Sequence, residues 1–232
     1  NESSYLENDY YSVNVSATID LAKAAIDNGV KFFVFVSSTK AGGNPISGKC
    51  SDEKDQYEPE GIYGKTKREA EIKLLELGRK SDMHVSIIRP ALIYGPNMKG
   101  NLKLMLSAIK KGIFPPLPET GNRRSLIHVD DLVEAILLIS DDYRTKGEIF
   151  IATDGINYSS RDIYKSMCTI AGKPIPKWNV HKSLFYIFSK LSPQMKYKID
   201  KLLGDQCYTS QKLNKLGFKA KRRLREMNET SF

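Results

Sequence analysis

The spacing of apolar residues changes along the chain, and each change marks an expected element. Residues 10–28 repeat apolar side chains at helical intervals and end at Asn28-Gly29, so we expect a helix there. The next segment, Lys31–Val36, is a short unbroken apolar run, typical of a strand buried in a parallel sheet. A polar loop over 40–60 then leads into a second expected helix at 61–80.

The same kind of pattern continues through the second half of the chain. His84–Arg89 is expected to be another buried strand, closed by Pro90 and running on into residues 91–96. A helix is expected at 101–111, followed by an irregular segment with three prolines at 113–118. Asp130-Asp131 is expected to cap a helix that ends at Ile139, and a strand should follow at 147–152. The last expectations are a helix from Ser159-Ser160 to Ala171, and short helices and loops beyond residue 174.

Strands and helices therefore alternate between residues 31 and 152. This alternation is typical of α/β proteins built on a parallel, doubly wound sheet. In such a sheet, ligands bind beyond the carboxyl ends of the strands. We therefore expect a ligand to bind near two stretches, Ser37-Ser38-Thr39 after the first expected strand and Arg89-Pro90-Ala91 after the second.

Composition narrows the class of protein further. The chain has 232 residues, of which 41% are hydrophobic and 27% charged, as in ordinary globular domains. No apolar run approaches the roughly 18 residues that a membrane-spanning helix needs. Three cysteines, Cys50, Cys168 and Cys207, are far apart and form no metal or redox motif. This usage predicts reduced thiols, a cytoplasmic protein and no metal site.

The net charge of +9 raises the question of an acidic partner. Such a charge is compatible with nucleic acid, a membrane surface or small anions. Much of it lies in Lys219–Arg225, which we expect to be part of a solvated tail. A nucleic-acid surface is expected to combine basic with stacking aromatic side chains. Since no aromatic residue lies within 219–225, the sequence argues against a nucleic-acid partner.

Tyr63 and Lys67 form the strongest candidate for chemistry. Their spacing of four residues places them on one face near the start of the expected helix. A nearby ammonium favours phenolate and would move a tyrosine pKa from about 10 toward neutral. The Ser38 hydroxyl would hydrogen-bond the same substrate oxygen. Together the three residues would form an acid–base site that moves the proton of a substrate alcohol while hydride leaves the alcohol carbon. The alternative is an exposed pair with no function.

Several motifs surround this pair. They are Val13–Thr18, Phe35–Ser38, Tyr63–Lys67, Ile88–Pro96, Arg124–Asp131 and Ser210–Phe218. With them, the chain resembles the extended short-chain dehydrogenase/reductase family, in its branch of nucleotide-sugar epimerases, dehydratases and 4-ketoreductases. The similarity runs from about Tyr10 to Phe218, and it implies NAD or NADP as cofactor and a UDP-sugar as substrate.

The resemblance also implies roles for individual residues near the cofactor. Tyr63 would be the general acid and base, and Lys67 would lower its pKa and hold the nicotinamide ribose. Ser38 would orient the sugar hydroxyl or ketone. Three further residues would line the nicotinamide, namely Ser37, Pro90 and Ile93.

The sugar nucleotide would be bound by a second set of residues. The resemblance assigns Ser38 and Thr39 to the sugar, and Asn101 and Leu102 to the diphosphate. Arg124 would pair with the same diphosphate, for which the guanidinium fork is well suited. Asp205 would accept the ribose hydroxyls of the nucleotide.

The resemblance implies an organisation of the chain as well. Residues 1–155 would form a partial Rossmann-type catalytic domain with a substrate-binding segment at 97–124. Residues 156–218 would form a small, mostly helical substrate-binding region, followed by the basic tail 219–232. Helices 10–28 and 61–80 would pack against a second subunit in a homodimer.

The reaction can be narrowed within this branch. Sugar 4,6-dehydratases place an Asp-Glu pair directly after the hydroxyl residue, where this chain has Thr39 and Lys40. Chemistry confined to C4 of a UDP-hexose or UDP-N-acetyl-hexosamine is therefore favoured, by a 4-epimerase or a 4-ketoreductase. A non-catalytic Rossmann-type binding or regulatory protein is the alternative from another class.

One feature of the family does not occur in this sequence. Its members open with a strand and a Gly-x-x-Gly-x-x-Gly turn that holds the dinucleotide pyrophosphate. Gly42-Gly43 follows a different strand and does not lead directly into a helix. We therefore expect two or more strand–helix steps to precede Asn1, and with them most of the adenosine site.

Overall fold

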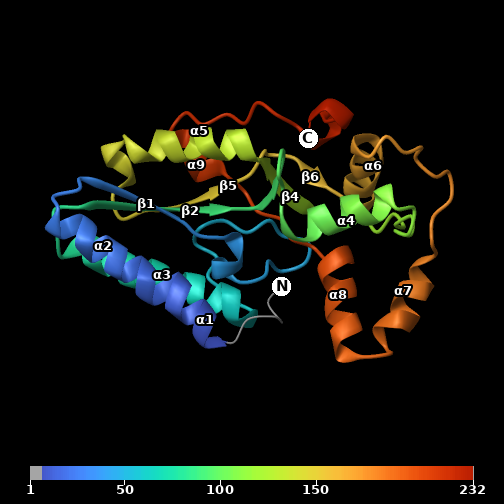
Figure 1. The fold of residues 1–232 in the computed structure, drawn as a ribbon, viewed down its shortest axis with the longest axis horizontal. Coiled ribbons are helices and arrows are strands. Elements are labelled where there is room, and N and C mark those ends of the chain that lie inside the picture. Colours follow the sequence, from blue (N-terminus) through green and yellow to red (C-terminus); the bar gives the residue numbers. More distant parts are fainter. Residues whose placement is uncertain (1–6, 232) are drawn as a thin grey trace.

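Helices enclose a three-stranded parallel sheet in the structure, a computed structural model that describes residues 7–231 (Figure 1). The strand order is β1-β2-β5, with β1 at Phe32–Val36, β2 at His84–Pro90 and β5 at Ile149–Ala152. β2, the central strand, is buried along its whole length, as expected for a strand inside a parallel sheet. All three predicted strands of this sheet are confirmed.

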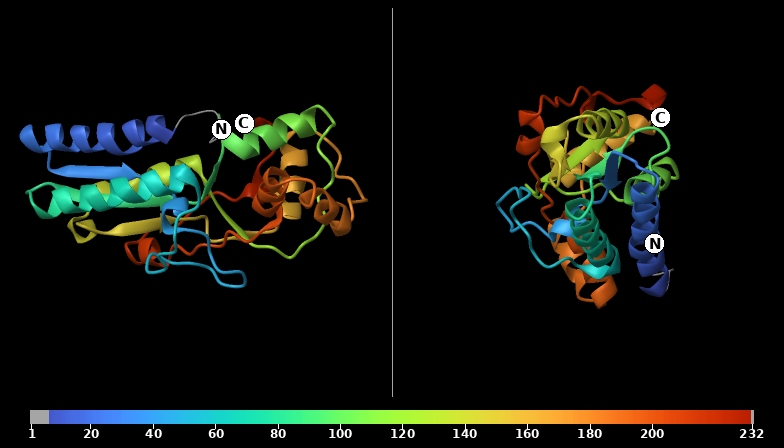
Figure 2. Two further views of the ribbon diagram at one scale, coloured as in Figure 1. Left: turned by 90° about the horizontal axis from the view of Figure 1, so that it is seen from below. Right: turned by 90° about the vertical axis from the view of Figure 1, so that its left-hand side faces the viewer.

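One face of the sheet is covered by two long helical segments. The first consists of α1 (Glu7–Tyr11), a π-helical stretch (Ser12–Ala17) and α2 (Thr18–Asp27), and the second is α3 (Gly61–Arg79). Their inward side chains form one buried cluster with the sheet, made of Val15, Ala22, Phe35, Ala70, Leu74, Met83, Val85 and Ile87. Figure 2 shows the two segments side by side. Both predicted helices are confirmed.

The other face is covered by α5 (Val129–Ser140) and α9 (Gln211–Lys215). Their apolar side chains pack on β2 and β5 in a second cluster, with members Ile88, Ile127, Leu132, Ala135, Ile139, Phe150, Ala152, Leu213 and Phe218. Helices on both faces of a parallel sheet are the arrangement of a Rossmann-like α/β fold. The predicted fold class is confirmed, and α9 is one of the short helices expected beyond residue 174.

A second, smaller sheet lies beside the first. Its strands are β3 (Leu92–Tyr94), β4 (Arg124–His128) and β6 (Asn157–Tyr158), in the order β3-β4-β6, with β6 antiparallel. The helices at this end are α4 (Gly100–Lys110), α6 (Ser160–Ile170), α7 (Lys182–Ser189) and α8 (Pro193–Leu203). Short 3-10 turns occur at Thr39–Gly42, Tyr143–Thr145, Leu224–Glu226 and Glu229–Ser231.

The start of α5 differs from the expected cap. His128 is the N-cap residue, and its Nδ1 accepts a hydrogen bond of 3.2 Å from the backbone N–H of Asp130. Asp131 is fully buried, and its Oδ2 accepts from the backbone N–H groups of Lys221 and Arg222 at 3.1 and 3.0 Å. Asp131 therefore fastens the C-terminal segment to the body of the protein instead of capping its own helix.

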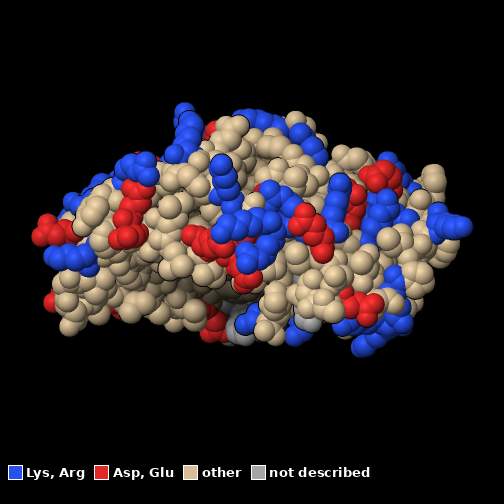
Figure 3. All heavy atoms as spheres, turned by 90° about the horizontal axis from the view of Figure 1, so that it is seen from above, with Lys and Arg blue, Asp and Glu red and all other residues tan. Residues whose placement is uncertain are grey.

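The basic segment 219–225 is not the solvated tail that its charge predicts. Leu224 is fully buried, and Arg222 Nη1 lies 2.8 Å from Asp131 Oδ1. Lys221 pairs with Glu134 at 2.7 Å. On the face that carries α5 and this segment, Figure 3 shows basic and acidic side chains intermixed. Charge pairing thus offsets much of the positive charge on which a nucleic-acid interface would depend.

Candidate active site

Lys67 reaches the carboxyl end of β1 from the second turn of α3. Its Nζ donates a hydrogen bond of 3.1 Å to the carbonyl oxygen of Val36, the last residue of the strand, and lies 4.6 Å from the centre of the Phe35 ring. Burial lowers the pKa of Lys67, and the nearby Glu71 carboxylate opposes that shift. The ammonium is therefore held where Ser37 and Ser38 leave the sheet.

Tyr63 lies on the first turn of the same helix and is half-buried. Its ring meets the ring of Tyr10 edge-on, with centroids 6.3 Å apart. Gly64, the next residue, sits against the 3-10 turn Thr39–Gly42. A Cβ at this position would lie 2.9 Å from the Lys40 carbonyl oxygen, so glycine allows the helix start to approach the Ser38-Thr39 segment.

Ser37 and Ser38 differ in their surroundings. The Ser37 N–H donates to the Ile88 carbonyl at 2.8 Å and so extends the pairing of β1 with β2. The Ser37 hydroxyl is buried, and within residues 7–231 it has no hydrogen-bond partner. Ser38 is half-buried and caps the 3-10 turn, its Oγ accepting from the Lys40 N–H at 3.3 Å.

Pro90 and Ile93 continue this edge of the sheet. Pro90 ends β2 opposite Ala152 of β5 and is buried. Ile93 lies in the middle of β3, opposite Ile127. The structure thus gathers the predicted catalytic and nicotinamide residues around the carboxyl ends of β1 and β2 and the start of α3, with Ile93 on the adjoining strand.

Arg124 lies on β4 and is mostly buried, with 8% of its surface exposed. Its Nη1 donates to the carbonyl oxygens of Lys201 and Leu202 at the end of α8, at 2.5 and 3.2 Å. Burial lowers the pKa of this guanidinium. Arg124 therefore holds the C-terminal end of α8, because its guanidinium is hydrogen-bonded to backbone carbonyls of that helix.

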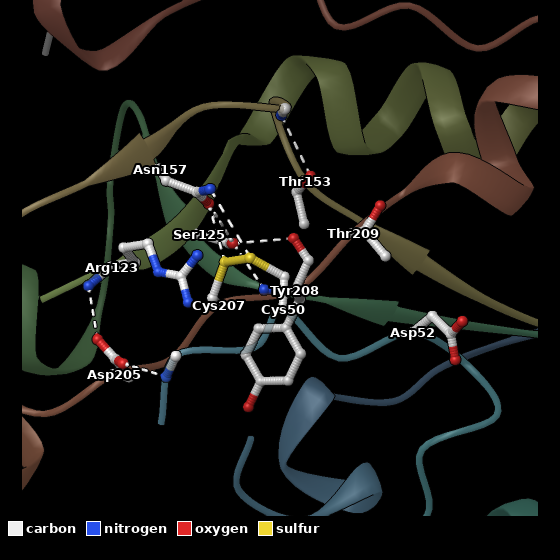
Figure 4. The surroundings of a disulfide bond; sticks show 12 residues. Cys50, Asp52, Arg123, Ser125, Thr153, Asn157, Asp205, Cys207, Tyr208 and Thr209 are labelled. Atoms are coloured by element: carbon white, nitrogen blue, oxygen red, sulfur yellow. Dashed lines mark hydrogen bonds between the residues drawn. A yellow bond between two sulfur atoms is a disulfide. The ribbon is translucent and has the colours of Figure 1, made fainter. Parts of the chain in front are cut away.

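Asp205 joins two loops. Its carboxylate accepts from the backbone N–H of Arg123 at 2.8 Å, and from the Gly48 N–H and the Ser47 hydroxyl at 3.1 Å each. Burial on its own would raise the pKa of Asp205, but these hydrogen bonds outweigh that effect and lower it. Figure 4 shows Asp205 beside Arg123.

Asn101 and Leu102 lie farther along the chain, in the first turn of α4. Leu102 is 2% exposed and packs in the cluster that α4 and α6 share, so its backbone alone is available to a ligand. Asn101 is exposed. No hydrogen bond among residues 7–231 ties the Asn101 side chain to the residues around β1.

Tyr208 was not predicted, although it connects the two groups of residues. Burial raises the pKa of Tyr208 to about 12, while the Thr39 side chain and the positive charges of Arg124 and Arg89 oppose the shift. Its backbone exchanges hydrogen bonds with the Ser125 hydroxyl. The motif Ser210–Phe218, which begins two residues later, was the available signal in the sequence.

The cysteines also differ from expectation. Cys50 and Cys207 form a disulfide with a Cα–Cα distance of 4.4 Å (Figure 4). Cys168 is a buried free thiol. The prediction of three reduced cysteines is therefore wrong. It failed because 157 residues of sequence separate the partners, and the fold alone brings them together. The bond joins the loop after the 3-10 turn to the segment that carries Asp205 and Tyr208.

We expect thiol titration of the denatured, unreduced protein to find one thiol per chain, and three after reduction. Cys168→Ala should remove the single thiol of the unreduced protein. Replacing both Cys50 and Cys207 by serine should lower the free energy of unfolding by about 2–4 kcal/mol, because the bond restricts the unfolded chain. Three thiols before reduction would contradict the assignment.

The described residues show neither a metal cluster nor a membrane-spanning helix. Among residues 7–231, no group of three or more His, Cys, Asp or Glu side chains is placed to hold a metal ion. None of the helices in this range combines the length and apolar character that crossing a membrane requires.

Comparison with known proteins identifies the family. The sequence model of the "NAD dependent epimerase/dehydratase family" matches residues 1–152. The "UDP-glucose 4-epimerase" of Vibrio cholerae is 35% identical over 222 residues, which cover 94% of this chain and 67% of that protein. The chain thus belongs to the NAD dependent epimerase/dehydratase family, and it spans about two thirds of the length of this relative.

A second relative and a solved structure agree with this assignment. The "N-acetyl-alpha-D-glucosaminyl-diphospho-ditrans,octacis-undecaprenol 4-epimerase" of Escherichia coli O157:H7 is 28% identical, covering 91% of this chain and 67% of the relative. The structure of UDP-glucose 4-epimerase from Thermotoga maritima with UDP-glucose superimposes with a TM-score of 0.74, at 21% identity, covering 95% of this chain and 68% of that one. This likeness confirms the Rossmann-like fold. The resemblance to nucleotide-sugar epimerases, and with it the assignment to an NAD-dependent enzyme family, is confirmed.

Proposed function

We propose that this chain carries the catalytic and sugar-binding residues of an enzyme that acts at C4 of a UDP-hexose or UDP-N-acetyl-hexosamine. The observation that carries the proposal is the position of Lys67. Its ammonium is hydrogen-bonded to the last residue of β1, next to Ser37 and Ser38, and Tyr63 lies one helical turn before it in α3. These are the residues that proton transfer at a secondary alcohol requires.

Tyr63 acts as the general base in this mechanism. Its phenolate removes the proton of the C4 hydroxyl, and Lys67 favours the phenolate by its positive charge. Ser38 donates a hydrogen bond to the same substrate oxygen and so keeps it facing Tyr63. In the return step, the Tyr63 phenol gives the proton back to the oxygen at C4.

A nicotinamide dinucleotide is the cofactor of the family, and several residues here fit its nicotinamide half. The Ser37 hydroxyl is buried and has no hydrogen-bond partner among residues 7–231. It lies with the Lys67 ammonium at the carboxyl end of β1, where such a ring and ribose would find hydrogen-bond partners. Pro90 and Ile93 supply apolar surface. When bound, the cofactor accepts the hydride of C4 and returns it.

The sugar nucleotide is proposed to lie along the segments that Tyr208 joins. Thr39 contacts the sugar, and Asn101 with the backbone of Leu102 meets the diphosphate. Arg124 reaches the diphosphate by exchanging its hydrogen bonds to the carbonyls of Lys201 and Leu202. Asp205 accepts the ribose hydroxyls, which requires exchange of the bonds from Ser47 and Gly48.

We favour 4-epimerase over 4-ketoreductase. The two reactions share Tyr63, Lys67 and Ser38, so the site alone does not separate them. The name of the Vibrio cholerae relative supports the epimerase. Thr39 and Lys40, in place of an acidic pair, support chemistry that does not eliminate water.

Assembly and location complete the proposal. We propose a homodimer formed by the outward sides of the segment Ser12–Asp27 and of α3, where Val13, Leu21 and Ile72 are exposed by 66, 63 and 56%. We place the enzyme in the cytoplasm, where nucleotide sugars and dinucleotides are made. Because cytoplasmic thiols are kept reduced, the Cys50–Cys207 bond would open there unless the fold protects it.

The test is incubation of the full polypeptide with a UDP-4-keto-hexosamine and NADH or NADPH, and in a separate reaction with a UDP-hexose or UDP-N-acetyl-hexosamine. Stoichiometric loss of absorbance of the reduced nicotinamide identifies a ketoreductase. Interconversion of UDP-hexoses without net consumption identifies the epimerase that we expect. No turnover with any UDP-hexose or UDP-N-acetyl-hexosamine would refute the proposal in favour of a non-catalytic binding protein.

A further inference from the structure

The hairpin of α7 and α8 extends from the end of the molecule opposite β1 (Figure 1). Neither helix contains a buried residue. A few side chains of the hairpin anchor it, since Phe185, Leu202 and Leu203 pack against the core cluster of α4 and α6. The anchored side accounts for only part of the apolar surface that these helices carry.

A second apolar stripe runs along the solvent side of α7 and continues into the turn after it. Leu184, Ile187 and Phe188 of the helix are exposed by 44, 55 and 48%, and Leu191 in the turn is exposed by 68%. The three helix residues are spaced as on one face of a helix. In a globular protein such a stripe normally faces the core, but here the core is contacted by Phe185 on another side. We call these four residues the outer stripe.

More apolar side chains are exposed in the same part of the chain. Trp178 and Tyr186 are exposed by 64 and 63%, and Tyr197 by 44%. The segment before α7 is held in place, because Val180 N–H donates to the Pro116 carbonyl and Arg161 to the Pro176 carbonyl. Large apolar side chains left exposed along one helix face, as in the outer stripe, are typical of an interaction site.

The charge around the outer stripe indicates the kind of partner. Residues 173–203 contain one acidic residue, Asp200, and seven lysines, at 173, 177, 182, 190, 196, 198 and 201. The ion pairs formed within residues 7–231 all lie elsewhere in the protein. Lys190 and Lys201 lie instead against the rings of Tyr186 and Tyr197, at 4.5 and 5.1 Å.

We propose that the α7–α8 hairpin docks on an anionic membrane surface. Apolar and aromatic side chains enter the boundary between headgroups and acyl chains, while lysines meet anionic headgroups. α7 and α8 have 8 and 11 residues and rise only about 12 and 16 Å, so they lie on the bilayer and do not cross it. A second copy of the chain would bring like charges together, which disfavours it as the occupant.

The test is co-sedimentation of the full polypeptide with vesicles. We expect binding to vesicles of phosphatidylglycerol and phosphatidylethanolamine, weaker binding at high salt, and little binding to pure phosphatidylcholine. Ile187→Ser with Phe188→Ser should lower the partition coefficient at least about tenfold, because the outer stripe loses its largest apolar groups. The matched control is Val133→Ser with Leu137→Ser, on α5, where the side chains are exposed by 49 and 62%; it should bind like the unchanged protein.

Lys182→Gln with Lys190→Gln provides a second test that leaves apolar packing intact. It should weaken binding to the anionic vesicles and reduce the salt dependence. Absence of binding by the unchanged protein would overturn the proposal, and so would equal binding of the Ile187/Phe188 variant and its control. Self-association in sedimentation velocity that the Ile187/Phe188 variant abolishes would also overturn it, in favour of a second copy. The measurement uses no sugar nucleotide, so its failure leaves the proposed reaction untouched.

Discussion

Tyr63→Phe should lower kcat by about 10²–10⁴-fold while the affinity for the sugar nucleotide stays nearly unchanged. The substitution removes only the phenolic oxygen that is proposed to carry the proton. The ring stays, and with it the edge-on contact with Tyr10 at 6.3 Å. Steady-state kinetics and calorimetric titration with the UDP-sugar measure the two quantities separately, on the full polypeptide.

Tyr11→Phe is the matched control for this experiment. The Tyr11 hydroxyl donates to Glu69 at 2.9 Å on the exposed side of α3, so its loss should leave kcat unchanged. Lys67→Met should lower kcat as Tyr63→Phe does, without a loss of stability, because the buried ammonium is already disfavoured in the fold. Turnover of Tyr63→Phe at the normal rate would refute the role of Tyr63.

Glu71→Gln should lower the free energy of unfolding by about 3–5 kcal/mol, because it leaves Arg89 as a buried charge without its partner. The two side chains are each 1% exposed. Arg89 Nε lies 2.8 Å from Glu71 Oε1, and Nη2 lies 2.5 Å from Oε2. The same guanidinium lies under the 3-10 turn, where a Cβ on Gly42 would come within 3.0 Å of Nη1. Urea unfolding measures the loss.

The control for this prediction comes from the same helix. Glu69 pairs with Lys73 at 3.0 Å, but the two side chains are 41 and 43% exposed. Glu69→Gln should therefore change the free energy of unfolding by no more than about 1 kcal/mol. Similar losses in Glu71→Gln and Glu69→Gln would mean that burial does not determine the strength of the Arg89–Glu71 pair. Replacing both Arg89 and Glu71 by apolar residues should recover much of the loss.

The sequence predicted well those elements whose signal is local. β1 is an unbroken apolar run, β2 has three apolar residues at Val85, Ile87 and Ile88, and helix α6 begins with the capping pair Ser159 and Asp162, whose side chains and backbone bond each other. β4 was not predicted, since only Leu126 and Ile127 among its five residues are apolar, and its three polar residues Arg124, Ser125 and His128 are buried as well. Their polar groups are satisfied by segments far along the chain, as by the Lys201 and Leu202 carbonyls for Arg124. No local pattern contains that information.

The residues of the candidate site also differ in how far the sequence could predict them. The spacing of Tyr63 and Lys67, and the strand end before Ser37, were visible in the sequence and follow from local geometry. The buried Arg89–Glu71 pair, the contact of Tyr208 with Thr39 and the hydrogen bonds of Asp205 depend on chain segments that meet only in the folded protein. The prediction of a solvated tail at 219–225 failed for a related reason. The positive charge of this segment does not reveal that its backbone is hydrogen-bonded to the buried Asp131.

The Cys50–Cys207 bond gives the backbone the topology of a ring with two tails. The ring contains the central strand β2, the whole second sheet and the hairpin α7–α8, whereas β1 lies in the N-terminal tail and is held to the ring by hydrogen bonds and packing alone. A single proteolytic cut within the ring would leave both fragments on one covalent frame, each at a high effective concentration for the other. A cut between β1 and Cys50 would instead release the strand whose end Lys67 contacts.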